Sequence, residues 1–95
     1  MNSFSLKNAL IYDSDAEDFI SGGIAFEDGV ITEIGALSPQ ALKCARDVHG
    51  RRIIPAMVDV HSHGRDGIDF CGASERELLR LKAAYAAVGT ATVVP

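Results

Sequence analysis

The chain has 95 residues, 47% of them hydrophobic, with a formal net charge of −4 at pH 7. This length suits one small domain, and the acidic balance excludes the basic surface typical of nucleic-acid binding. We see no N-terminal leader with a basic and an apolar part, and no apolar run near the roughly 18 residues of a membrane span. The two cysteines, Cys44 and Cys71, have no CxxC spacing, which favours a reducing compartment. We therefore expect a cytoplasmic protein that binds neither nucleic acid nor membrane.

The first predicted element is a half-buried strand over residues 4–12. Its apolar residues alternate, which is typical of a strand with one covered face. The side chains expected on that face are Phe4, Leu6, Leu10 and Tyr12, with Asn8 as an interruption. The acidic stretch from Asp13 to Asp18 follows as a surface loop.

A hairpin is predicted next, from residues 20–26 and 30–34. Asp28-Gly29 separates these two apolar runs and suits a type I′ or bulged turn. Gly22-Gly23 lacks the spacing of a phosphate-binding loop, so we interpret it as a strand irregularity. A helical turn over residues 41–45 and a short strand near Asp47 complete an N-terminal part of short antiparallel strands.

The most informative stretch is residues 53–64, IIPAMVDVHSHG. It begins with apolar and β-branched residues, which predicts a buried strand, and ends in His61 and His63. Residues i and i+2 of a strand point to the same side, so both imidazoles are expected to lie together near its C-terminal end, with Asp59 behind them. Neutral imidazole binds Zn²⁺, Fe or Ni²⁺ well, so we predict a metal site.

A helix and a second strand follow this stretch. Ser74 and Glu77 form a capping box, Leu78, Leu81, Tyr85 and Val88 recur at helical spacing, and Gly89 is a natural stop. Leu78, Leu81 and Tyr85 are expected to face the sheet. Residues 90–94 are β-branched and apolar, which predicts another buried strand. Residues 53–95 are therefore predicted to be one parallel, right-handed β-α-β unit.

Other polar residues are weaker candidates. Asp13, Asp15 and Asp18 lack the glycine and terminal glutamate of a calcium loop, and His49 has no partner at i+2, which favours an ordinary turn histidine. Ser62 is expected to face away from the histidines. Cys71 has no base at a defined spacing, so a reactive thiol there has little support.

Residues 55–64, PAMVDVHSHG, resemble the Pro-Gly-x-x-Asp-x-His-x-His-Gly signature of the amidohydrolase superfamily, with Ala56 in place of the usual glycine. The loop GRDGIDF at 64–70, the helix after it and GTATVVP at 89–95 look like N-acetylglucosamine-6-phosphate deacetylases. The resemblance implies an α/β fold: residues 1–52 as part of a small β-sandwich, and 53–95 as the first β-α-β unit of a (β/α)₈ barrel. A barrel of that kind needs roughly 250 residues, so it is incomplete in this chain.

The resemblance also implies hydrolysis of the acetamide of N-acetylglucosamine 6-phosphate to glucosamine 6-phosphate and acetate. His61 and His63 would be ligands of a divalent metal: Zn, Fe, Co or Ni. The family's Glu ligand, two later histidines and Asp acid/base would lie beyond Pro95, so no catalytic residue is assigned within this chain. Asp66 and Asp69 do not match those positions and are expected to be loop residues.

Two alternatives to the deacetylase stay open. Another amidohydrolase, such as a dihydroorotase-like cyclic amide hydrolase, would carry the same histidine pair. A non-catalytic remnant that folds alone or on a partner would lack the other ligands. In every case the 95-residue chain by itself is expected to be inactive and to self-associate through open sheet edges.

Overall fold

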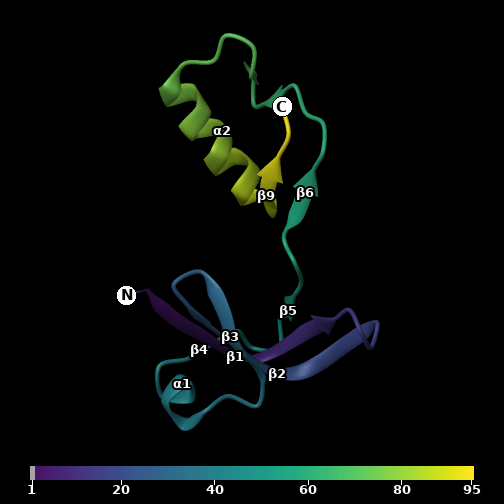
Figure 1. The fold of residues 1–95 in the computed structure, drawn as a ribbon, viewed down its shortest axis with the longest axis vertical. Helices are drawn as coiled ribbons and strands as arrows, with labels where there is room; N and C mark the ends of the chain where they lie inside the picture. The colour runs from purple at the N-terminus through teal and green to yellow at the C-terminus, as the bar shows by residue number, and fades with distance from the viewer. Residues whose placement is uncertain (1) are drawn as a thin grey trace. The chain divides into compact units, whose positions relative to one another are not determined.

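The computed structural model describes residues 2–95, which form two compact units (Figure 1). One unit ends at Pro55 and the other spans Ala56–Pro95. The first unit extends past the predicted boundary at Arg52 because strand β5, Arg52–Ile53, pairs with strand β1, Ser3–Asp13. The assignment of the units to a β-sandwich and a barrel stays a prediction.

The first unit is a five-stranded sheet with one short helix. Besides β1 and β5 it contains β2 (Asp18–Glu27), β3 (Val30–Gly35), α1 (Pro39–Lys43) and β4 (Arg46–Asp47). The strand order is β3-β2-β1-β4, and β5 also lies beside β1. Strand β2 is antiparallel to β1 and β3, whereas β4 and β5 run parallel to β1.

The predicted hairpin is confirmed in β2 and β3. Its turn residues Asp28 and Gly29 have φ values of 49° and 80°. Positive φ at both central positions is the geometry that Asp-Gly favours. This local signal therefore identifies the turn correctly.

The strand at residues 4–12 exists, and its predicted covered face is right for Leu6, which packs against the core, but wrong beyond Asn8. There Ala9 and Ile11 are buried against Ile24, whereas Tyr12 is exposed; Phe4, at the start of the strand, is exposed as well. The register shifts between Leu6 and Ala9, and Asn8 between them has a φ of 55°. A bulge of this kind moves every later side chain to the other face of the sheet, which explains the reversal.

The second unit contains the predicted β-α-β order. Its elements are β6 (Met57–Asp59), β7 (Gly64–Arg65), β8 (Ile68–Asp69), α2 (Glu75–Ala87) and β9 (Thr90–Val93). Strands β6 and β9 are parallel, and β7 and β8 form a small antiparallel hairpin between β6 and α2 (Figure 1). The parallel pair and the helix are confirmed.

Helix α2 begins at the predicted place because its first turn is capped by side chains. Ser74 Oγ accepts the Glu77 backbone N–H at 3.2 Å, and Glu77 Oε1 accepts the Ser74 backbone N–H at 3.1 Å. Leu81 and Tyr85 are 1% and 6% exposed and pack with Ile68, Phe70, Ala73 and Val93. Leu78 lines one hollow with Leu81, Tyr85 and the β9 residue Val93, so it faces the sheet as predicted, although it stays 45% exposed.

The prediction of one buried strand from residue 53 is also wrong. The stretch divides into β5 and β6 on either side of Pro55, which has no N–H to donate to a ladder. Met57, Val58 and Val60 are 57%, 62% and 75% exposed. Within residues 2–95, β6 pairs with β9 alone, so its apolar side chains are not enclosed. No helix in this part of the chain is long and apolar enough to cross a membrane.

Candidate metal centre beyond strand β6

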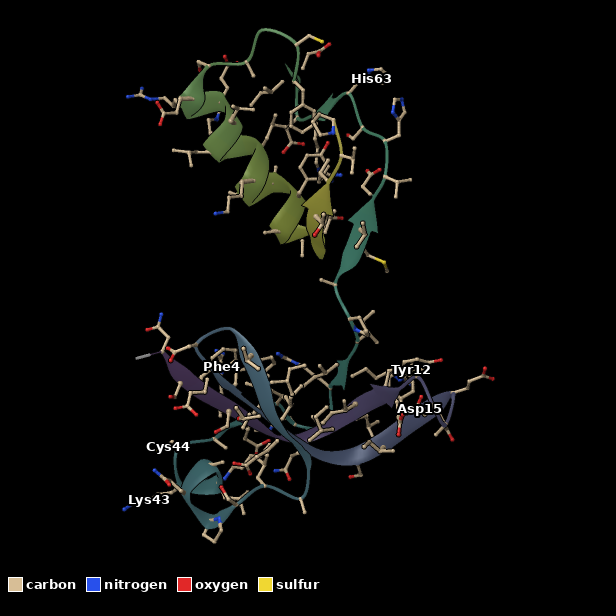
Figure 2. All side chains as sticks on the ribbon, in the orientation of Figure 1. Phe4, Tyr12, Asp15, Lys43, Cys44 and His63 are labelled. Atoms are coloured by element: carbon tan, nitrogen blue, oxygen red, sulfur yellow. The ribbon has the colours of Figure 1, made fainter. Side chains whose placement is uncertain are left out.

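His61 and His63 lie together on the segment that follows β6, and Figure 2 shows His63 on this segment. Their ring centres are 4.9 Å apart and the ring planes meet at 83°. Strand β6 ends at Asp59, so both histidines lie beyond the strand and not within it as predicted. The structure nevertheless brings the two imidazoles side by side, and both are exposed.

Backbone hydrogen bonds hold this segment at Ser62, between the histidines, and at His63. The Ser62 N–H donates to Val94 O at 3.1 Å, which continues the contact between β6 and β9. The Phe70 N–H donates to His63 O at 2.9 Å. One bond involves Ser62 and the other His63, so together they restrict the backbone that carries both imidazoles.

The hairpin after the histidines requires glycine at position 64. Gly64 has a φ of 140°, and a Cβ added there would lie 1.9 Å from Ile68 O. Only glycine allows β7 to approach β8 so closely. Residues 64–70 were expected to form a loop and the hairpin within them was not predicted, although Asp66-Gly67 has the same residue pair as the turn at Asp28-Gly29.

Asp59, which was expected to lie behind the imidazoles, has a half-buried carboxylate. Asp59 Oδ1 accepts the backbone N–H of His61 at 3.1 Å. This bond caps the end of β6 and helps to turn the chain toward the histidines.

The remaining polar residues nearby have local roles. Asp66 is exposed in the β7–β8 turn, where its carboxylate lies 3.8 Å from Arg65 Nε. Asp69 Oδ1 accepts the Cys71 backbone N–H at 2.8 Å. A hollow of about 360 Å³ is lined by Ser62, His63, Asp69, Phe70, Cys71, Leu78 and Pro95. Within residues 2–95, no three His, Cys, Asp or Glu side chains gather closely enough to hold a metal ion.

The third histidine, His49, lies in the first unit. It occupies a turn with a φ of 55°, and its Nδ1 is 3.5 Å from Asp47 Oδ1. The His49 backbone N–H and the Asn8 side-chain amide both donate to the Asp47 carboxylate, and these bonds lower the pKa of Asp47 below its usual 3.8. This arrangement fits the predicted turn histidine.

Comparisons with known proteins identify deaminases as relatives. The chain is 37% identical over 65 residues to a 5′-deoxyadenosine deaminase of Methanosarcina mazei, which covers 66% of this chain. It is 35% identical over 65 residues to the enzyme of that name from Methanosarcina acetivorans. An adenine deaminase of Methanoregula boonei is 32% identical over 89 residues, or 94% of this chain. These deaminases are members of the amidohydrolase superfamily.

The chain spans about 15% of the length of these relatives. No protein-family model matches it. A solved structure of a Bacillus thuringiensis protein is 29% identical, with a TM-score of 0.44, and the match covers 68% of this chain and 93% of that one. The curated similarity is therefore to amidohydrolase-superfamily deaminases, and it does not extend to the predicted deacetylase specificity.

Proposed function

We propose that His61 and His63 bind a divalent cation in a metal-dependent hydrolase of the amidohydrolase type. The observation that carries this proposal is the distance between the two imidazoles. Two imidazoles bound through nitrogen to one zinc ion, at about 2.0–2.1 Å each, would have ring centres about 4.5–5.5 Å apart. The observed 4.9 Å lies within that range.

The chemistry of the pair also suits a cation. Neutral imidazole is a good ligand for Zn²⁺, Fe and Ni²⁺, and both rings are exposed and open to an incoming ion. When bound, a divalent cation lowers the pKa of a water molecule in its coordination sphere to about 7. The role of this chain is to hold and orient the two imidazoles through the backbone hydrogen bonds with Val94 and Phe70.

We propose removal of an amino group from an adenine-type base as the reaction, because the curated relatives are named as adenine and 5′-deoxyadenosine deaminases. In that reaction a bond forms between water oxygen and the ring carbon. The carbon–nitrogen bond then breaks and ammonia leaves. A second candidate is deacetylation of N-acetylglucosamine 6-phosphate, favoured by the likeness of the loop at 64–70 to that family.

The same proposal covers the architecture. The sheet of the first unit would be part of a β-sandwich, and β6-α2-β9 would be the first β-α-β unit of a barrel. A parallel strand–helix–strand unit with functional residues after the first strand is the arrangement that such barrels use.

Metal titration of the 95-residue chain tests the site. We expect Co²⁺ binding to weaken at least about 100-fold in a His61→Ala, His63→Ala double variant, since it removes both proposed ligands and even the loss of a group that only orients a ligand typically weakens binding about 10- to 100-fold. His49→Ala is the matched control, because it removes an exposed histidine from the other unit. Equal affinity in the double variant and the wild-type chain would refute the site.

Product release from the whole protein encoded by the gene tests the reaction. After loading with Zn²⁺, Fe²⁺ or Co²⁺, we expect ammonia from adenine or 5′-deoxyadenosine. Acetate from N-acetylglucosamine 6-phosphate would establish the second candidate instead. The chain by itself supplies two ligands, whereas catalytic zinc usually takes three from the protein, so we expect no turnover from it alone. Turnover by the chain that vanishes in the double variant would show that self-assembly supplies the rest.

A further inference from the structure

Ser62, between the two histidines, is held through both its backbone and its side chain. Its backbone N–H donates to Val94 O at 3.1 Å. Its hydroxyl Oγ accepts the Gly64 N–H at 3.3 Å and shares a hydrogen bond with the hydroxyl of Tyr85. The side chain of Ser62 therefore reaches helix α2, while the imidazoles before and after it are exposed.

Tyr85 supports the same segment in a second way. Its ring stacks on Phe70, with centres 6.2 Å apart and planes 11° from parallel. The backbone N–H of Phe70 donates to His63 O at 2.9 Å. One buried side chain on α2 thus contacts both residues that hold the histidine segment: Ser62 through its hydroxyl and Phe70 through its ring.

The hydroxyl of Tyr85 has a defined consequence for the imidazoles. In an extended segment alternate side chains point to opposite sides, so fixing Ser62 toward α2 directs its two neighbours away from the helix. Without this bond, Ser62 could rotate and the Tyr85 hydroxyl would lose its partner in an interior where buried polar groups are normally paired. The separation and relative angle of the imidazoles would then vary.

We propose that Tyr85 is a positioning residue that sets the relative orientation of His61 and His63 through its hydrogen bond to Ser62. This inference rests on the proposed function, since the orientation of the pair affects binding only if both imidazoles hold one cation. In this role Tyr85 acts through Ser62 and is not itself a ligand of the cation. Groups that orient metal ligands from behind typically account for a 10- to 100-fold difference in metal affinity.

The first test is Tyr85→Phe in the 95-residue chain, which keeps the ring and its contact with Phe70 and removes only the hydroxyl. We expect about tenfold weaker Co²⁺ binding and altered visible absorption bands of the bound Co²⁺. The matched control is Tyr12→Phe, because Tyr12 lies in the other unit (Figure 2) and its hydroxyl makes no hydrogen bond within residues 2–95. Affinity and bands equal to wild type in Tyr85→Phe would overturn the proposal.

Ser62→Ala removes the same hydrogen bond from the other side, together with the acceptor of the Gly64 N–H, and keeps the Tyr85 ring in place, so it is a second test if Tyr85→Phe folds poorly. We expect the double variant to lose no more affinity than Ser62→Ala alone, because the Tyr85 hydroxyl acts through Ser62. Additive losses would mean that the two hydroxyls act separately, and would overturn the proposal.

A metal-free measurement separates this proposal from the proposed function. In the NMR spectrum of the apo chain, the ring signals of His61 and His63 should shift in Tyr85→Phe and Ser62→Ala, while those of His49 stay in place. Unchanged His61 and His63 signals would overturn the positioning role, whatever the metal does. If wild type binds no Co²⁺ but these signals move, the proposed function fails and the positioning role stands.

Discussion

Each of the two units is stabilised internally by a different kind of contact. In the first, β1 and β2 have 11 and 10 residues and pair along most of their length. In the second, β6 and β9 have three and four residues. The second unit depends instead on one helix, whose Leu81 and Tyr85 pack on Ile68. The histidine pair lies in the unit with the shorter ladder.

This difference indicates where each unit is vulnerable. A long antiparallel ladder distributes stability over many cross-strand pairs, so no single side chain dominates it. In a cluster of three buried residues, the loss of one side chain removes a large share of the stabilising contacts. Candidate functional segments are commonly drawn from the less stable part of a protein, because they must move or open to bind.

The largest expected effect is that of Leu81→Ala. Leu81 is buried at the centre of the α2 cluster, so its truncation should reduce the free energy of unfolding of the second unit by about 3 kcal/mol. Leu79→Ala is the control on the same helix, since Leu79 is exposed. Hydrogen exchange of the α2 and β9 amides measures the effect. Equal protection in the two variants would contradict the idea that one cluster holds this unit.

Gly64→Ala is expected to have the next largest effect. The added Cβ would meet Ile68 O, and φ at this residue is positive, so β7 must separate from β8 at a cost of about 2–3 kcal/mol. Gly29→Ala in the first unit is the control: φ there is also positive, but the space is open, and a cost of about 1 kcal/mol is expected. Thermal unfolding measures the melting temperatures of the two variants. Equal decreases would mean that the contact between the added Cβ and Ile68 O does not destabilise the hairpin.

The features that the sequence predicts correctly depend on neighbouring residues. Asp28-Gly29 determines the turn between β2 and β3, and the Ser74–Glu77 capping box determines the start of α2. Each signal acts within four residues. His61 and His63 are also only two residues apart, so their proximity could be predicted from the sequence. The end of β6 at Asp59 could not.

The features that sequence reasoning missed depend on distant or non-periodic contacts. The bulge at Asn8 reverses the face of β1, and only the residue type, which tolerates positive φ, hinted at it. The pairing of β5 with β1 joins residues about 40 positions apart, beyond any local pattern. The bond from Ser62 to Tyr85 spans 23 positions. Helical spacing indicates that Tyr85 is buried, but it does not indicate what its hydroxyl contacts.

The smallest expected effect concerns pH and the first unit. Hydrogen bonds from the His49 N–H and the Asn8 amide lower the pKa of Asp47, so its carboxylate stabilises the folded state most fully above its unfolded pKa of 3.8. This contribution is lost as pH falls through the lower folded pKa. Asp47→Asn should therefore be less stable than wild type at pH 7, and the difference should shrink below 3.8. Asp15→Asn, in the exposed β1–β2 turn (Figure 2), is the control, because the Asp15 carboxylate accepts no hydrogen bond within residues 2–95, and it should be as stable as wild type at pH 7. A difference between Asp47→Asn and wild type that stays constant down to pH 2 would show that Asp47 acts through its shape and not through its charge.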